Sequence, residues 1–175
     1  GKETVRLSFE VVVPDIPFLV ATAERLKTDW FTVGVEFIPL VINPTEVAQG
    51  VIRTRDYQVL LFGNVLRGNP DMFSFWHSSE RFRPGLNLSL YENRAVDAAL
   101  EAVRTEADAA ERSQLLAKIQ GAIVADKPAL FLYSPHYLYA SPRTLGGVSD
   151  QLIANAGDRF ADVEEWYLKT ARVFK

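Results

Sequence analysis

Hydrophobic and polar positions alternate between strand-like and helix-like periods along the first half of the chain. Residues 7–13 are apolar and β-branched, which predicts a buried strand. Apolar residues then recur at helical spacing over residues 19–30, and Gly34 ends that helix. Residues 35–40 predict a second strand, which Pro39 places at a sheet edge or a strand end. The order predicts a β-α-β unit.

The capping residues between these stretches favour a second β-α-β unit. Asp15 offers an N-cap to the first helix, and Thr45 offers one to a short helix over residues 47–52. Residues 57–62 predict a third buried strand. Residues 64–93 then show no clear period, but they hold too many aromatic residues for a disordered segment. We expect a folded loop with short helical turns there.

Two further helices and two further strands are predicted in the second half. Asn93 caps the first of these helices, and Asp108 with Glu111 forms a capping box for the second. Strand-like runs follow at residues 129–133 and 137–140. The whole pattern predicts an α/β fold, a three-layer sandwich in which helices cover both faces of a mixed, mainly parallel sheet.

Composition narrows the class of protein. The 175 residues carry 19 basic and 22 acidic side chains, a net charge of −3, which disfavours nucleic acid as a partner. We expect one domain, residues 1–175. The absence of cysteine excludes disulfides and thiolate metal sites, and no apolar run approaches the roughly 18 residues that span a bilayer. The chain begins directly on a strand pattern, so we expect it to be a piece of a longer protein.

The sequence shows no recognisable catalytic motif. Its two histidines, His77 and His136, lack metal-ligand spacing, and neither a serine nucleophile elbow nor a P-loop is present. We therefore expect no metal, no cofactor and no enzymatic activity. Acidic residues on the helices, among them Asp97 and Glu101, are interpreted as solvated surface.

One segment stands out by position. In open α/β sheets, ligands bind beyond the carboxyl ends of the strands. Four polar residues follow the 57–62 strand and are the candidate ligand-binding residues: Asn64, Arg67, Asn69 and Asp71. The alternative is that residues 69–71 form a turn and that Arg67 is a solvated loop cation.

Several pieces of the sequence, taken in order, resemble the C-terminal lobe of a family 5 extracellular solute-binding protein of the oligopeptide-, dipeptide- and nickel-binding group. The resemblance covers about residues 7–168, and no single piece is specific. The pieces are the helix over residues 23–34 with Val35 and Glu36, the strand at 57–63, residues 69–71 with Phe73, residues 75–79, Asn87, Ser89, Tyr91, Asn93 with Val96 and Asp97, Asp108, Glu111 with Arg112, and residues 126–129 and 165–167.

The resemblance implies one lobe of a periplasmic-binding-protein type II fold. It also implies a function, the capture of a small-molecule or peptide-like solute and its delivery to the permease subunits of an ABC importer. The other lobe, N-terminal in such proteins, would be a partner within the same protein. The implied location is the periplasm or, for a lipoprotein, the cell surface.

The sequence departs from the peptide-binding members of that family in the candidate segment. Those members carry Trp and Asp at the positions of Asn64 and Arg67, and the Asp pairs with the α-ammonium group of the peptide. Because Arg67 cannot bind an ammonium, we expect an anionic or sugar-like solute rather than a free-amine peptide. A slip of one or two residues in the alignment would give the aspartate role to Asp71.

Two rival functions remain open. One is a small α/β hydrolase or phosphatase that uses Asp71 and His77. Turnover of a generic ester or phosphate that is lost when either residue is changed would support it. The other is an interaction module whose exposed aromatic loop docks a protein partner.

Overall fold

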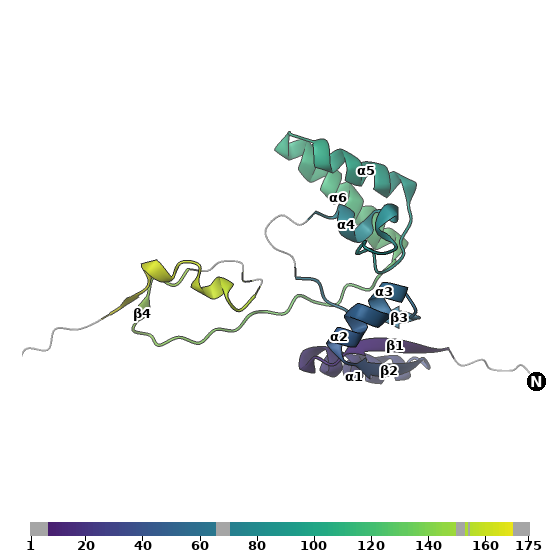
Figure 1. Ribbon diagram of the computed structural model, residues 1–175, viewed down its shortest axis with the longest axis horizontal. Helices are drawn as coiled ribbons and strands as arrows, with labels where there is room; N and C mark the ends of the chain where they lie inside the picture. Colours follow the sequence, from purple (N-terminus) through teal and green to yellow (C-terminus); the bar gives the residue numbers. More distant parts are fainter. Residues whose placement is uncertain (1–6, 66–70, 150–152, 154, 170–175) are drawn as a thin grey trace, which may run out of the picture. The chain divides into compact units, whose positions relative to one another are not determined.

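The computed structural model describes residues 7–65, 71–149, 153 and 155–169. The chain forms two compact units. The first comprises residues 1–64 and 71–129, and the second comprises residues 65–70 and 130–175. Figure 1 shows a sheet with its covering helices and a pair of long helices in the first unit. None of the described helices is long and apolar enough to cross a membrane.

A three-stranded parallel sheet is the centre of the first unit. Its strands are β1 (Ser8–Pro14), β2 (Glu36–Ile42) and β3 (Val59–Leu60), in the order β2-β1-β3. Val11 of β1 pairs with Pro39 on one side. Because Pro39 lies in an edge strand, its missing N–H leaves no gap in the ladder, as the sequence predicts. The expected α/β fold with a parallel sheet is confirmed.

Helix α1 (Pro17–Phe31) connects β1 to β2. Proline at its first position fits the fixed φ of that residue and leaves no donor unpaired. The N-cap is Ile16, with no side-chain cap bond, so the expectation that Asp15 caps this helix is wrong. Gly34 follows the helix with a φ of +81°, a conformation that glycine adopts without a Cβ clash.

One face of the sheet packs on α1. Val11 and Val13 of β1 are 1% and 0% exposed and contact Leu19 and Ala23 of the helix. Burial of each valine contributes about 1.5 kcal/mol or more to folding. On the opposite face, Ile38 and Leu40 of β2 remain 37% and 36% exposed. That face of the sheet is therefore covered only in part. The cluster on the α1 face consists of Val11, Val13, Leu19, Ala23, Phe37 and Leu61, with Ile16, Val20, Leu26, Trp30 and Val59 around it.

A continuous helical stretch leads from β2 to β3. It comprises α2 (Pro44–Glu46), the π-helical turn η1 (Val47–Val51) and α3 (Ile52–Thr54). Its cap is Asn43, whose Oδ1 accepts from the amide of Thr45 at 2.9 Å. The expected cap, Thr45, is therefore wrong by two residues, because the Asn side chain reaches the first free N–H of the helix.

Short turns and two long helices make up the rest of the first unit. They are α4 (Phe73–Trp76), the 3₁₀ turn η2 (Ser78–Glu80), α5 (Arg94–Thr105) and α6 (Ala109–Asp126). Helices α5 and α6 pack on each other as a hairpin (Figure 1). Their shared core consists of Tyr91, Val96, Ala99, Leu100, Val103, Ile119 and Ile123.

The two predicted caps of this hairpin are present. Asn93 Oδ1 accepts from the amides of Ala95 and Val96, and Asp108 Oδ1 accepts from those of Ala110 and Glu111. The capping box at Asp108 is only half formed. Its own amide donates to the Glu106 carboxylate at 2.8 Å instead of to Glu111.

The second unit contains a small antiparallel sheet and two short turns. Strands β4 (Leu145–Gly146) and β5 (Tyr167–Leu168) pair with each other, and η3 (Asp158–Phe160) and η4 (Val163–Glu165) precede β5.

The strands expected at residues 129–133 and 137–140 are not formed, and the larger sheet is parallel rather than mixed. The apolar pattern of these residues suits a strand, but a strand also needs a neighbour to pair with, and the described residues supply none here. Leu130 and Leu138 are accordingly 67% and 90% exposed.

Candidate functional site

The candidate segment after β3 runs from Asn64 to Asp71, and the structure describes both of these residues. Asn64 follows β3 and is exposed, as expected for a residue beyond the carboxyl end of a strand. Arg67 and Asn69 lie outside the described residues. β3 is at the edge of the described sheet, so this segment leaves an edge strand. The central strand is β1, which pairs with β2 on one side and with β3 on the other.

Asp71 is already paired. Its Oδ1 accepts from the Phe73 amide at 3.1 Å, and its Oδ2 lies 3.2 Å from Nη2 of Arg104 on α5. Both side chains of this pair are about half exposed, so the pair contributes less than about 1 kcal/mol. The Arg104 guanidinium also lies over the Phe73 ring, 4.4 Å from its centre. Asp71 therefore acts as an anchor between the start of α4 and helix α5.

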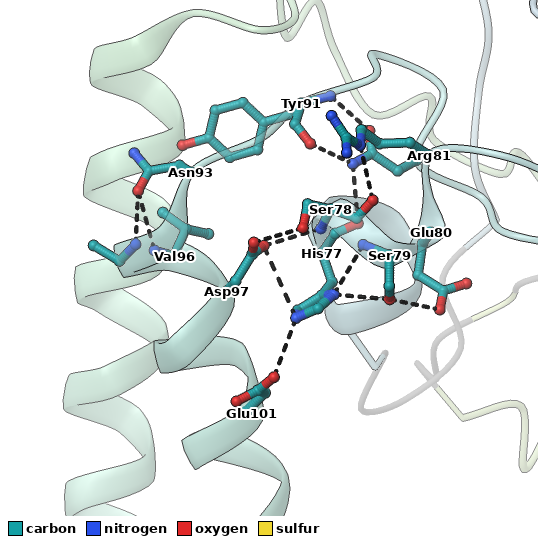
Figure 2. A network of polar contacts seen from close by, with 12 residues as sticks. His77, Ser78, Ser79, Glu80, Arg81, Tyr91, Asn93, Val96, Asp97 and Glu101 are labelled. Atoms are coloured by element: carbon teal, nitrogen blue, oxygen red, sulfur yellow. Dashed lines mark hydrogen bonds and ion pairs between the residues drawn. The ribbon is translucent and has the colours of Figure 1, made fainter.

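His77 is buried behind this anchor. It is 8% exposed, and its ring stacks on Phe73 with the ring centres 4.0 Å apart. Its Nδ1 accepts from the Ser79 amide at 3.1 Å, and Ser79 Oγ lies at 2.8 Å. Because a backbone amide can only donate, the proton of the neutral ring is on Nε2. Nε2 faces Glu101 Oε1 at 3.4 Å and Asp97 Oδ1 at 4.0 Å without a well-formed hydrogen bond (Figure 2).

Asp97 fixes the 3₁₀ turn to helix α5. Its two oxygens accept from the amide and the hydroxyl of Ser78, at 2.9 and 2.7 Å. Its side chain is only 15% exposed, so the interpretation of Asp97 as solvated surface is wrong. A carboxylate near the start of a helix is also favoured by the helix dipole. Glu101, one turn further on, is 66% exposed, as expected.

Asn87 is the fully buried polar side chain of this region. Its Nδ2 donates to the carbonyls of His77 and Tyr91, at 3.1 and 2.9 Å. Its Oδ1 accepts from the Tyr91 amide at 3.1 Å and from the Ser89 hydroxyl at 3.2 Å. The amide thus makes all four of its hydrogen bonds while 0% exposed. It joins the start of the 3₁₀ turn to the segment that leads into α5.

A second polar contact joins that segment to the end of α6. Tyr91 Oη and Asn93 Nδ2 both donate to Asp126 Oδ2, at 2.6 and 2.8 Å. Burial, and then the hydrogen bond to Asp126, raise the pKa of Tyr91 to about 12. The same hydrogen bonds, from Tyr91 first and Asn93 second, lower the pKa of the Asp126 carboxyl.

These contacts hold the loop and helices α4, α5 and α6 of the first unit to one another. Asp71 and His77, the pair of the hydrolase hypothesis, have different partners, Arg104 for the first and the α5 carboxylates for the second. Ser79 contacts His77 only as its second neighbour in a capped turn. Among the described residues, no group of three or more metal-ligating side chains is placed to hold a metal ion.

No protein-family model and no curated protein sequence matches the chain. Solved structures do. The oligopeptide-binding protein AppA of Bacillus subtilis, solved with a nonapeptide, matches 96% of the chain at 22% identity and a TM-score of 0.76. NikZ of Campylobacter jejuni, solved with Ni(L-His), matches 95% at 22% identity and a TM-score of 0.67. MoaA of A. tumefaciens R10, solved with mannopinic acid, matches 94% at 19% identity and a TM-score of 0.66.

The chain spans about a third of the length of these proteins, 33% of AppA and 34% of NikZ and MoaA. Its fold is therefore that of one lobe of a periplasmic-type binding protein. More particularly, it is the fold of the family 5 oligopeptide- and nickel-binding proteins, as the sequence resemblance implies.

Replacement of Asn87 by alanine is expected to lower the free energy of unfolding by about 3 kcal/mol, because the His77 carbonyl and both backbone groups of Tyr91 would lose their buried partner. Urea denaturation followed by circular dichroism measures this. The exposed Asn64→Ala serves as the matched control, with a change below about 0.5 kcal/mol. An Asn87→Ala protein as stable as the control would contradict the assignment.

Replacement of Tyr91 by phenylalanine is expected to flatten the pH dependence of stability at both ends. The raised pKa of Tyr91 stabilises the fold below about pH 10, and that stability is lost as the pH rises through about 12. The lowered pKa of Asp126 stabilises the fold at pH values above the ordinary pKa of an aspartic acid. That stability is lost as the pH falls through the lowered pKa of the folded protein.

Tyr57→Phe is the control for this experiment. Burial raises the pKa of Tyr57 as well, but its hydroxyl donates to the Leu88 carbonyl and not to a carboxylate. This variant should therefore change the alkaline side only. The free energy of unfolding is measured from about pH 2 to about pH 12. An unchanged acid side in Tyr91→Phe would refute the coupling to Asp126.

Proposed function

We propose that the chain is part of the extracytoplasmic solute-binding component of an ABC importer, which captures a solute and delivers it to the permease. The observation that carries this proposal is the match of nearly the whole chain, at a TM-score of 0.76, to a peptide-binding protein. Proteins with a nickel complex and with mannopinic acid match over a similar share. We propose the periplasm, or the cell surface for a lipoprotein, as the location.

The single domain expected for residues 1–175 stays a prediction, as a C-terminal-lobe piece of a two-lobed protein. In such a protein the solute contacts both lobes and stabilises the closed state by its preference for that state. The N-terminal lobe would then be the partner of this chain. The exposed apolar residues Leu130 and Leu138 support a partner of this kind, since an apolar surface in water favours burial.

The longer protein with both lobes is expected to bind its solute at least about 100-fold more tightly than this chain alone, because most of the differential contacts need both lobes. The solute would be identified by mass spectrometry of the purified two-lobed protein, and both affinities measured by calorimetry. Submicromolar binding by the chain alone would refute the two-lobe account. A two-lobed protein that binds no solute would refute the function itself.

We further propose that Asn64, Arg67, Asn69 and Asp71 contact the solute, which is anionic or sugar-like rather than a free-amine peptide. A guanidinium offers a bidentate fork to a carboxylate or phosphate and repels an ammonium. Support comes from Asp71, the other carboxylate that could receive an ammonium in this segment. It already has Arg104 as its counter-ion and the Phe73 amide as a donor.

In the two-lobed protein, Arg67→Asp is expected to weaken binding of the native solute and to improve binding of ligands with a free amine. A desolvated Arg67 would change affinity by about 3 kcal/mol, and an exposed one by less than about 1 kcal/mol. Calorimetry with the native solute and with a free-amine peptide measures both. Arg83→Asp, the same charge change elsewhere in the chain, is the control. An unchanged ligand preference in Arg67→Asp would transfer the role to Asp71.

A further inference from the structure

Arg159 in the second unit lies in an aromatic setting. Its guanidinium is 4.4 Å from the centre of the Phe160 ring and 5.5 Å from that of Tyr139. Its Nη1 donates to the Tyr137 hydroxyl at 2.8 Å. The Trp166 ring packs against both aromatic neighbours, with its centre 5.7 Å from Phe160 and 6.4 Å from Tyr139. Arg159 itself is only partly exposed, so these neighbours reduce the access of water to its guanidinium.

The charge of Arg159 has no counter-ion among the described residues. The acidic side chains next to it in sequence have other partners. Asp158 accepts from the Asn155 amide at 2.9 Å, and Asp162 accepts from the Ser149 hydroxyl. The Nε–H of Arg159 is buried and has no acceptor in the described part of the chain. Such a buried, unpaired donor costs about 1–3 kcal/mol, so native proteins rarely retain one without a reason.

We propose that Arg159, with Tyr137, Tyr139 and Phe160, forms a recognition site for a ligand carboxylate. The Nε and Nη2 groups form one edge of the guanidinium, and a carboxylate can accept two parallel hydrogen bonds from such an edge. It would give Nε the acceptor that it lacks and supply the missing negative charge. The stacked rings strengthen the pair because they exclude water around it.

Binding also requires that the ligand can reach the Nε group of Arg159. Tyr137 and Tyr139 are each 41% exposed, so neither ring is enclosed by protein, and binding requires one of them to rotate away from the covered Nε. A purely structural arginine would need only the ring stacking and the Tyr137 hydroxyl, and it would be indifferent to added carboxylates. The two roles are therefore separable by titration.

The experiment uses the 175-residue chain, labelled with ¹⁵N, and sodium succinate as the probe at constant ionic strength set with NaCl. The reporters are the indole N–H of Trp166 and the Nε–H of Arg159. A saturable shift of both is expected below about 50 mM succinate. The indoles of Trp30 and Trp76, which lie in the first unit, should not move.

Variants assign the shift to this guanidinium. Arg159→Gln should abolish it, and Arg159→Lys, which keeps the charge but loses the fork, should weaken binding at least about fivefold. The exposed Arg143→Gln removes the same charge from the same unit and should bind like the wild type. If Arg159→Gln disrupts the fold of the second unit, so that the dispersed Trp166 signal is lost, the affinity of Arg159→Lys tests the assignment instead.

Three results would overturn the proposal. They are the absence of a saturable shift, equal binding by wild type and Arg159→Lys, and binding of inorganic phosphate as tight as that of succinate. None of them bears on the proposed transport function, because the titration reads only side chains of the second unit.

Discussion

The buried amide of Asn87 is the interaction on which the middle of the chain depends. A long segment without regular structure has many backbone N–H and C=O groups, and each one that is buried needs a partner. Asn87 makes four hydrogen bonds at one point, three with backbone groups of His77 and Tyr91 and one with the Ser89 hydroxyl. Tyr91 can therefore lie in the hairpin core with its backbone N–H and C=O both paired with the Asn87 side chain.

Further contacts around Asn87 extend this constraint in both directions. Toward the sheet, the Arg55 guanidinium donates to the carbonyls of Arg81, at 3.0 Å, and Gly85, at 2.7 Å. Toward the helices, Asp97 holds the 3₁₀ turn and Asp126 holds the segment before α5. Each of these contacts joins a side chain to a loop. The sheet and the helical hairpin are thus connected through side chains that bind the loop between them.

The parts that the sequence predicts well are those that depend on near neighbours. The caps at Asn93 and Asp108 form because each side chain reaches an amide two or three residues away. The three parallel strands are predicted by their apolar, β-branched runs, which pack on α1. Residues 129–140 have the same kind of pattern, but pairing with a neighbour decides whether they form strands.

The candidate site could be predicted only in part, for a related reason. The position of Asn64 and Asp71 follows from the end of a strand, which periodicity reveals. The roles of Asn87 and Asp97 depend mainly on backbone groups 4 to 19 residues away, which no local spacing indicates. Asn87 is one of the pieces of the family resemblance, but the residues around it do not distinguish its role from those of the other asparagines of this loop. A buried amide with backbone partners leaves no pattern of residue types.

The contacts at the described end of this loop bear on how a binding lobe could hold a solute. Ordering a loop on binding costs about 0.5–1.5 kcal/mol for each immobilised side chain, so contacts held in place beforehand bind more tightly. The described candidate residues are Asn64, which follows β3, and Asp71, which Arg104 ties to α5. Arg104 also stacks on Phe73, and Phe73 stacks on His77, next to the carbonyl that Asn87 holds. The far end of the segment is therefore positioned by the same network that stabilises the helical hairpin.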